Sequence, residues 1–255
     1  MRWLAILVLA LAAPSAGSRI ATAAETTSAT FAVSWAGLDV GLVKLELVAD
    51  AAAYRLSWQG RTTGWFATLF PFESDGIAAG RVQGASFRPE SYDGRSAWRD
   101  GDARWRVAFA PDGRVARLEV PPEDLTTREP VPETLRVGPD PASLALSAVR
   151  QAEPGLRLAA RSFDGRRAFA YELACAEQVD LASGAELACS VFARLLAGAS
   201  RRWGSGSGAA EREPALIWLR RAGDGRFWPV RLEVSSRFGA VTARLLAWES
   251  PPAPG

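Results

Sequence analysis

The sequence predicts an all-β protein, a single strongly curled antiparallel sheet or incomplete β-barrel of about 11–13 strands, with one helix near residues 141–151. Two observations lead to this prediction. Apolar and polar residues alternate along many short segments, a pattern typical of half-buried strands. Asp-Gly pairs, the strongest short-range hairpin signal, separate many of these segments. The pairs lie at 75–76, 93–94, 100–101, 112–113, 164–165 and 224–225.

Residues 1–23 have the features of a cleaved signal peptide. An arginine precedes an unbroken apolar run over residues 4–13, and small residues at 21–23 suit a signal peptidase. We place cleavage after Ala23 or Ala24, with a second option near Ala16. The apolar run is shorter than the roughly 20 residues of a spanning helix, which disfavours an uncleaved anchor. We therefore expect a periplasmic protein that does not span the membrane after cleavage.

The next segments predict a meander of three strands. Residues 30–36 alternate strictly, with Trp35 among the aromatic and aliphatic side chains of one face. Residues 41–48 and 54–59 continue the alternation. Residues 64–72 are rich in aromatics and break it, which predicts a loop or a single helical turn that packs over an opening.

Further hairpins are predicted as far as residue 120. Strand character resumes at residues 76–82, and two strands flank the turn at Asp100. A four-residue loop there would place Trp98 opposite Trp105, a stabilising cross-strand pair. After a strand at 115–120, residues 121–139 contain five prolines, which predicts an excursion outside the sheet.

Asp140 and Pro141 predict the start of the helix. Aspartate at an N-cap accepts hydrogen bonds from free backbone N–H groups, and proline suits the first helical position. The helix should end near Gln151. Strands are then expected at 156–163, 168–175, 186–196, 215–219, 228–234 and 241–248. We expect one β domain over residues 25–250 and a disordered tail at 251–255.

Two cysteines lie on the apolar parity of neighbouring predicted strands. Cys175 and Cys189 are roughly equidistant from the intervening turn, and an exported protein with such a pair should form a disulfide. Their spacing is unlike the Cys-x-x-Cys motif of redox-active pairs. Two separate buried thiols are the alternative.

Composition excludes several classes of function. The chain has no histidine, which removes Ser-His-Asp and Cys-His catalysis and the commonest transition-metal ligand. Its net charge of +2 without a basic run argues against nucleic acid as a partner. Asp100 and Asp102 lack the ligand pattern of a calcium loop, and residues 204–208 lack the lysine of a phosphate loop. We expect no catalytic residues, no cofactor and no metal site.

Tryptophans supply the remaining candidate site. Nine of the ten follow residue 23, and many lie on inward parities, which predicts core packing. A curled sheet can also enclose a cavity for an apolar ligand. For such a cavity we nominate Trp35, Trp58, Trp65, Phe66 and Phe70.

An ordered set of short motifs spans most of the chain after residue 23. The set is Trp35-Ala-Gly37 with Val40-Gly41, Gly64 to Phe70, Asp140-Pro141, Phe163-Asp-Gly-Arg166, Ile217-Trp-Leu219, Trp228-Pro-Val-Arg-Leu-Glu-Val234 and Phe238-Gly239. In this order the motifs resemble the domain of unknown function 3108 family of exported bacterial proteins. The resemblance implies an all-β periplasmic protein without an established activity, so it assigns no functional residues.

These observations predict a non-catalytic periplasmic protein that serves in cell-envelope maintenance and binds a lipid-like or other apolar ligand. Half-open barrels resemble periplasmic lipoprotein carriers, an analogy of fold alone. One alternative is a structural or protein-interaction module whose partner is an envelope protein. The other is a hydrolase of unfamiliar type, which would need a cleft with clustered acids or an activated serine.

Overall fold

The structure is a computed structural model that describes residues 24–99, 101–177, 186–201, 213–222, 225–236 and 239–249. The predicted signal peptide, the Gly-Ser segment at 204–208 and the predicted tail lie outside these residues. The described strands are β1 (Glu25–Trp35), β2 (Leu38–Ala49), β3 (Ala53–Thr62), β4 (Phe72–Gln83), β5 (Ser86–Trp98), β6 (Gly101–Phe109), β7 (Val115–Glu119), β8 (Arg157–Phe163), β9 (Ala168–Cys175), β10 (Leu187–Ala197), β11 (Ala215–Arg221), β12 (Phe227–Val234) and β13 (Val241–Glu249).

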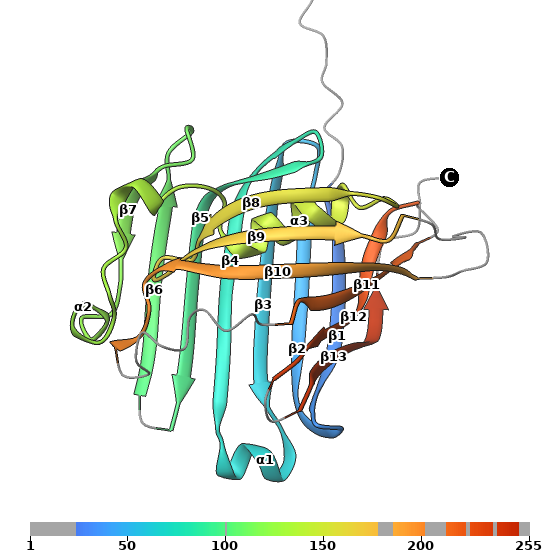
Figure 1. Ribbon diagram of the computed structural model, residues 1–255, viewed down its shortest axis with the longest axis horizontal. Helices are drawn as coiled ribbons and strands as arrows, with labels where there is room; N and C mark the ends of the chain where they lie inside the picture. The colour runs from blue at the N-terminus through green and yellow to red at the C-terminus, as the bar shows by residue number, and fades with distance from the viewer. Residues whose placement is uncertain are drawn as a thin grey trace, which may run out of the picture.

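All thirteen described strands belong to one antiparallel sheet with the order β7-β6-β5-β4-β3-β2-β1-β13-β12-β11-β10-β9-β8. The second half of the chain joins the first in the middle of this sheet, through the pairing of β1 with β13. Within the described chain, β7 and β8 are the two edges, so the sheet curls without closing. Strands β8 to β10 pass across the face of β3 to β5 (Figure 1). This confirms the predicted all-β, incomplete-barrel architecture.

Helix α3 (Pro141–Arg150) lies inside the curl, between β8 and β9 on one side and β4 and β5 on the other (Figure 1). Its N-cap is Asp140, whose side chain accepts from the backbone N–H groups of Ala142 and Ser143. The predicted helix and its cap are therefore confirmed. None of the helices in the described ranges is both long and apolar enough to cross a bilayer.

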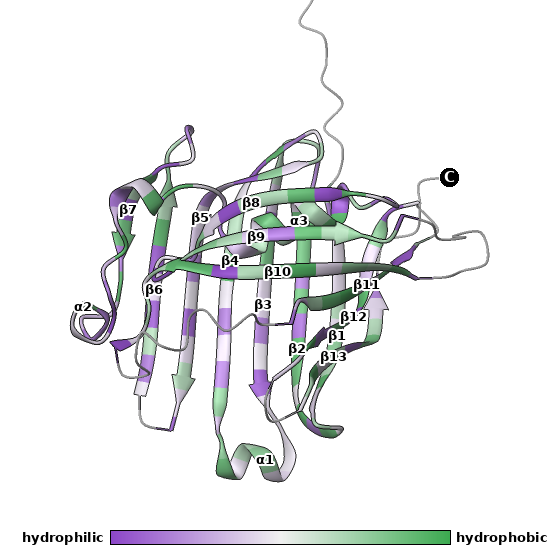
Figure 2. Cartoon of the chain, viewed as in Figure 1, coloured by the Kyte–Doolittle hydropathy of each residue, from purple (hydrophilic) through white to green (hydrophobic). Residues whose placement is uncertain are grey.

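The predicted excursion between β7 and α3 contains the short helix α2 (Asp124–Thr127) and the 3-10 turn η1 (Glu133–Leu135). The aromatic segment after β3 forms the short helix α1 (Gly64–Leu69), so the predicted helical turn is present, while its packing over an opening stays a prediction. Figure 2 shows α1 at one end of the sheet, with hydrophobic residues in green beside near-neutral residues in white.

Some of the turns predicted from Asp-Gly pairs are present in the structure, and others are not. The pairs at Asp112 and Asp164 lie in the β6–β7 and β8–β9 turns, and hairpins are also present at β5–β6 and β11–β12. The predicted turns at Asp75 and Asp93 are wrong, because both pairs lie inside long strands.

Glycines 76 and 94 serve a packing role inside those strands. A Cβ atom at Gly76 would lie 2.1 Å from the ring of Trp58, and one at Gly94 would lie 2.3 Å from the ring of Trp105. The two glycines are direct neighbours across β4 and β5. Each one leaves the space into which an indole ring packs, so here glycine supplies room and not a turn.

The predicted Trp98–Trp105 pair is also wrong. Trp98 lies opposite Gly101, and Trp105 lies opposite Gly94. The two strands extend further toward the turn than the alternation indicates, which leaves a shorter loop and shifts the register.

Candidate functional site

An apolar cavity of about 150 Å³ lies between helix α3 and strands β8 to β11. The helix contributes aliphatic side chains, and the strands contribute alternate residues of their inner face. The lining residues are Pro141, Leu144, Ala145, Ala148, Val149, Ala152, Leu158, Ala160, Tyr171, Leu173, Cys175, Cys189, Val191, Ile217 and Leu219. Among these lining side chains, only Tyr171 carries a hydroxyl group.

Two features of the sequence produce this cavity. On each strand the lining residues are two apart, as with Leu158 and Ala160, so they project from one face of the sheet. On the helix, Ala145 and Ala148 contribute only short side chains to the lining, and Ala145 is exposed, so the pocket is partly open to solvent. Long aliphatic walls opposite alanines leave unfilled volume.

The disulfide forms part of the cavity wall. Cys175 and Cys189 are direct partners across β9 and β10, and their sulfurs lie 2.05 Å apart, at disulfide distance. Both residues are buried in a small core cluster around Leu187, Leu219 and Phe227. The predicted pairing of the two cysteines is therefore confirmed, and the bond joins two strands of the wall.

A buried polar network fixes the opposite side of helix α3. The Asp140 carboxylate accepts from the N–H groups of Ala142 and Ser143, each at 2.9 Å, and from the Ser143 hydroxyl. Ser143 Oγ lies 2.5 Å from the hydroxyl of Tyr54 on β3. Ser147 Oγ accepts from the backbone N–H of Phe87 on β5 at 2.9 Å. The helix is thus held to β3 and β5 by hydrogen bonds and faces β8 to β11 with aliphatic side chains.

Burial sets the protonation behaviour of this network. Asp140 is fully buried, and desolvation raises the pKa of its carboxyl from 3.8 to about 6, despite hydrogen bonds that favour the charged form. Desolvation likewise raises the pKa of Tyr54. Because both Asp140 oxygens are already engaged with the helix, this group can anchor the helix but has no free oxygen directed at a ligand.

Four of the five nominated aromatic residues come together away from the cavity. The ring of Phe66 contacts those of Trp35, Trp65 and Phe70, with centroid distances of 6.1, 5.8 and 5.0 Å. Trp65 and Phe66 belong to α1 and Phe70 follows it directly. Trp65 and Phe70 are 59% and 58% exposed.

Trp58 lies elsewhere, stacked on Tyr92 with a centroid distance of 5.5 Å. It packs against the larger core cluster, which includes Tyr54, Phe87 and Val107. None of the five nominated residues lines the cavity beneath α3. Period-two alternation assigned faces to these side chains, but it carries no information on which part of the inner face a distant helix covers.

A family model of proteins of unknown function, DUF3108, matches residues 30–246. The chain belongs to the DUF3108 family. The match confirms the resemblance that the ordered motifs indicated. Comparison of this DUF3108 chain with curated proteins gives no match.

One solved structure similar to this DUF3108 protein is the crystal structure of a β-barrel-like protein of the domain of unknown function DUF1849 from Brucella abortus. The two chains are 10% identical, the superposition covers 90% of this chain and 99% of the other, and the TM-score is 0.48.

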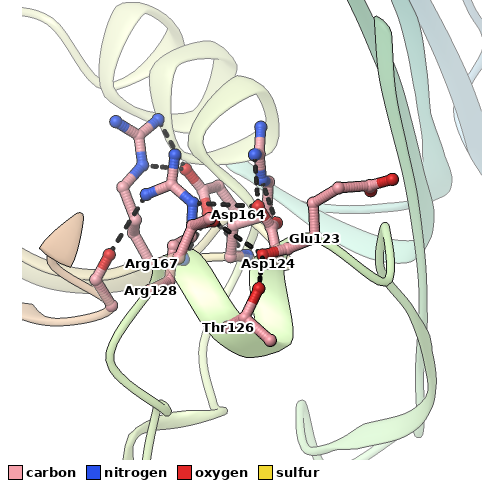
Figure 3. A network of polar contacts seen from close by, with 9 residues as sticks. Glu123, Asp124, Thr126, Arg128, Asp164 and Arg167 are labelled. Carbon is pink, nitrogen blue, oxygen red and sulfur yellow. Dashed lines mark hydrogen bonds and ion pairs between the residues drawn. The ribbon is translucent and has the colours of Figure 1, made fainter. Parts of the chain in front are cut away.

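The DUF3108 chain also contains a charged cluster that the sequence did not reveal. Asp124 on α2 is bound by Arg166, whose Nη2 lies 2.6 Å from Oδ1, and by Arg128, whose Nε lies 3.2 Å from the same oxygen. Beside them, Arg167 donates to Asp164 at 2.9 Å (Figure 3). Asp124 and Arg166 are 42 residues apart, so no local pattern could pair them.

Metal binding has no evident donor set in the described ranges. There, no three Cys, Asp or Glu side chains come together as a metal ion would need.

Proposed function

We propose that this DUF3108 protein is a non-catalytic periplasmic protein of the cell envelope that binds a lipid-like or other apolar ligand beneath helix α3. The observation that carries the proposal is the cavity of about 150 Å³ with aliphatic walls. Aliphatic walls of this kind favour a small apolar molecule such as benzene, because its binding removes apolar side chains from water. The ligand contributes an apolar group of similar size, such as a ring or the end of an acyl chain.

Two further features support the location and the role. The signal-peptide pattern of residues 1–23 and the Cys175–Cys189 disulfide suit an oxidising compartment outside the cytosol. The absence of histidine disfavours the familiar nucleophilic mechanisms.

A substitution that fills the cavity tests whether an apolar ligand binds there. Ala148 on α3 lines the cavity, so Ala148→Leu should occupy its volume; Ala247→Leu, at an exposed position on β13, is the matched control. We expect benzene to raise the melting temperature of the wild type and of the control, and to leave that of Ala148→Leu unchanged. Native mass spectrometry of protein purified from a periplasm should show a co-purified apolar molecule that Ala148→Leu lacks. If benzene stabilises all three proteins equally, or none of them, the cavity is not the binding site.

A second candidate function is a protein-interaction module of the envelope. Trp65, Leu69, Phe70 and Trp98 are each more than half exposed. Arg99 joins the Trp98 end of β5 to α1, because its Nη2 donates to the carbonyl of Leu69 at 2.9 Å. Grouped exposed side chains of this size mark interaction surfaces.

The second candidate is tested with a photo-reactive residue at position 65, compared with one at the exposed Arg88. We expect a defined crosslinked protein from position 65 alone, and its loss on Phe70→Ser. Equal crosslinking from both positions would exclude a specific surface at α1.

A further inference from the structure

A second pocket, of about 210 Å³, lies between the α2 excursion and the β8–β9 turn. It shares no lining residue with the cavity beneath α3. Among the residues that the structure describes, its ionisable lining residues are Asp124, Arg128, Glu129, Arg136, Arg166 and Arg201. Four arginines against two carboxylates give this small pocket an excess of two positive charges.

Part of this excess positive charge lies on partly buried side chains. Asp124 binds Arg128 and Arg166 at once, so one negative charge faces two positive charges. The side chains of these two arginines are only 21% and 16% exposed. Desolvation, followed by the positive charge of Arg166, lowers the pKa of Arg128. An anion bound in the pocket would offset this repulsion.

Arg136 provides a guanidinium that is free to bind such an anion. It is half-buried in the pocket wall, and its Nε donates to the carbonyl of Val131 at 2.9 Å. That bond directs the side chain but neutralises no charge, and no carboxylate in the described ranges pairs with it. Glu129 is exposed at the rim. Guanidinium groups match phosphate oxygens in geometry and charge.

The other wall of the pocket is apolar. It consists of Leu118, Val120, Leu125, Val131 and Phe163. Leu125 is 73% exposed, although it stands directly at the pocket. An apolar group on the ligand would cover it and recover the free energy of removing it from water.

We propose that this pocket binds a phosphate monoester carried on an apolar chain, with the phosphate on Arg136 and the Arg128–Arg166 pair and the chain against Leu125. A phosphate monoester carries between one and two negative charges at neutral pH, which matches the excess charge of the pocket. The inference goes beyond the proposed function and does not depend on it. The competing explanation is that the arginines only clamp α2 to the β8–β9 turn. A substitution of Arg136 distinguishes the two explanations, because Arg136 takes no part in the ion pairs with Asp124.

Calorimetric titration with hexyl phosphate and with inorganic phosphate tests the proposal. Wild-type protein should bind hexyl phosphate saturably, and Arg136→Gln should weaken it about tenfold or more, the effect of one charge-assisted hydrogen bond. The matched control is Arg88→Gln, which removes the same charge from an exposed arginine outside the pocket and should leave the affinity unchanged. If Arg136→Gln fails to fold, the exposed Arg201→Gln should still weaken binding several-fold.

The two probes also distinguish the sources of the phosphate. Tighter binding of hexyl phosphate, with the preference reduced by Leu125→Ser, supports an amphiphilic ligand such as a lipid phosphate. Equal affinity for inorganic phosphate overturns the apolar half of the proposal. Absence of saturable binding, or equal binding by Arg136→Gln and Arg88→Gln, overturns it entirely and leaves a structural clamp. Benzene stabilisation should be the same in wild type and Arg136→Gln, so failure here is separate from failure of the cavity.

Discussion

Replacing Asp140 with Asn should remove a specific pH dependence from the stability of this protein. Burial raises the folded-state pKa of the carboxyl from 3.8 to about 6, so between these values the folded protein holds a proton that the unfolded chain releases. The contribution of this group to stability is therefore fully present below pH 3.8 and is lost as the pH rises through 6.

The size of the effect follows from the shift. A displacement of about two pKa units corresponds to roughly 3 kcal/mol at about 1.4 kcal/mol per unit. Asparagine also caps helix N-termini well, so the variant should fold and keep the bonds to Ala142 and Ser143.

Urea unfolding of both proteins at several pH values between 3.5 and 7.5 measures the effect. Other groups titrate in the same way in both proteins, so the difference in unfolding free energy, wild type minus Asp140→Asn, isolates Asp140. We expect that difference to fall by about 3 kcal/mol from the lowest pH to the highest. A difference that stays flat, or rises with pH, would refute the assignment of a desolvated carboxyl to the N-cap of α3.

Three further predictions concern stability. Reducing the Cys175–Cys189 disulfide, which closes a loop with a sequence separation of 14, should cost about 3 kcal/mol in urea unfolding; no change would show that the bond constrains little. Gly94→Ala should destabilise by about 1–3 kcal/mol, because the new Cβ would lie 2.3 Å from an indole ring, whereas Gly60→Ala meets its nearest atom at 3.6 Å and should cost less. Equal melting temperatures for the two variants would contradict the packing role. Tyr54→Phe should cost about 1 kcal/mol and exceed Tyr92→Phe, whose hydroxyl makes no hydrogen bond in the described part of the protein; the reverse order would contradict the helix anchor.

The features that sequence predicted correctly depend on local geometry. Cys175 and Cys189 lie in adjacent strands of one hairpin, so parity and distance from the turn determine that they are opposite each other. The Asp140 cap is equally local, because its partners are two and three residues away. Neither prediction requires knowledge of how distant parts of the chain pack.

The wrong predictions concern positions whose structure depends on contacts with other strands. Asp-Gly at 93–94 has the same local sequence as Asp-Gly at 164–165, but only the second needs a positive φ, at Gly165. Gly94 is required by the ring of Trp105, which the register of β5 and β6 brings over it. A local pattern cannot distinguish a glycine that permits a turn from one that leaves room for a neighbouring strand.

The cavity beneath α3 and the pocket between α2 and the β8–β9 turn were not predicted, for the same reason. Ala148 lines the cavity only because α3 crosses β8 to β11, and those strands follow it in the chain. Arg166 reaches Asp124 only because the β8–β9 turn packs against α2. Both sites are formed by tertiary contacts between segments that are separate in sequence.

Helix α3 has two chemically different sides, and this difference explains how the cavity persists. Leaving an apolar pocket of about 150 Å³ unfilled and partly open to water has a free-energy cost, so a helix free to shift would move toward β8 to β11 and close it. The hydrogen bonds from Ser143 to Tyr54 and from Phe87 to Ser147 hold the helix to β3 and β5. Moving it would leave those buried polar groups unpaired, at a cost of about 1–3 kcal/mol each. The polar anchor on one side therefore keeps the apolar space open on the other, and an apolar ligand that filled it would recover the cost.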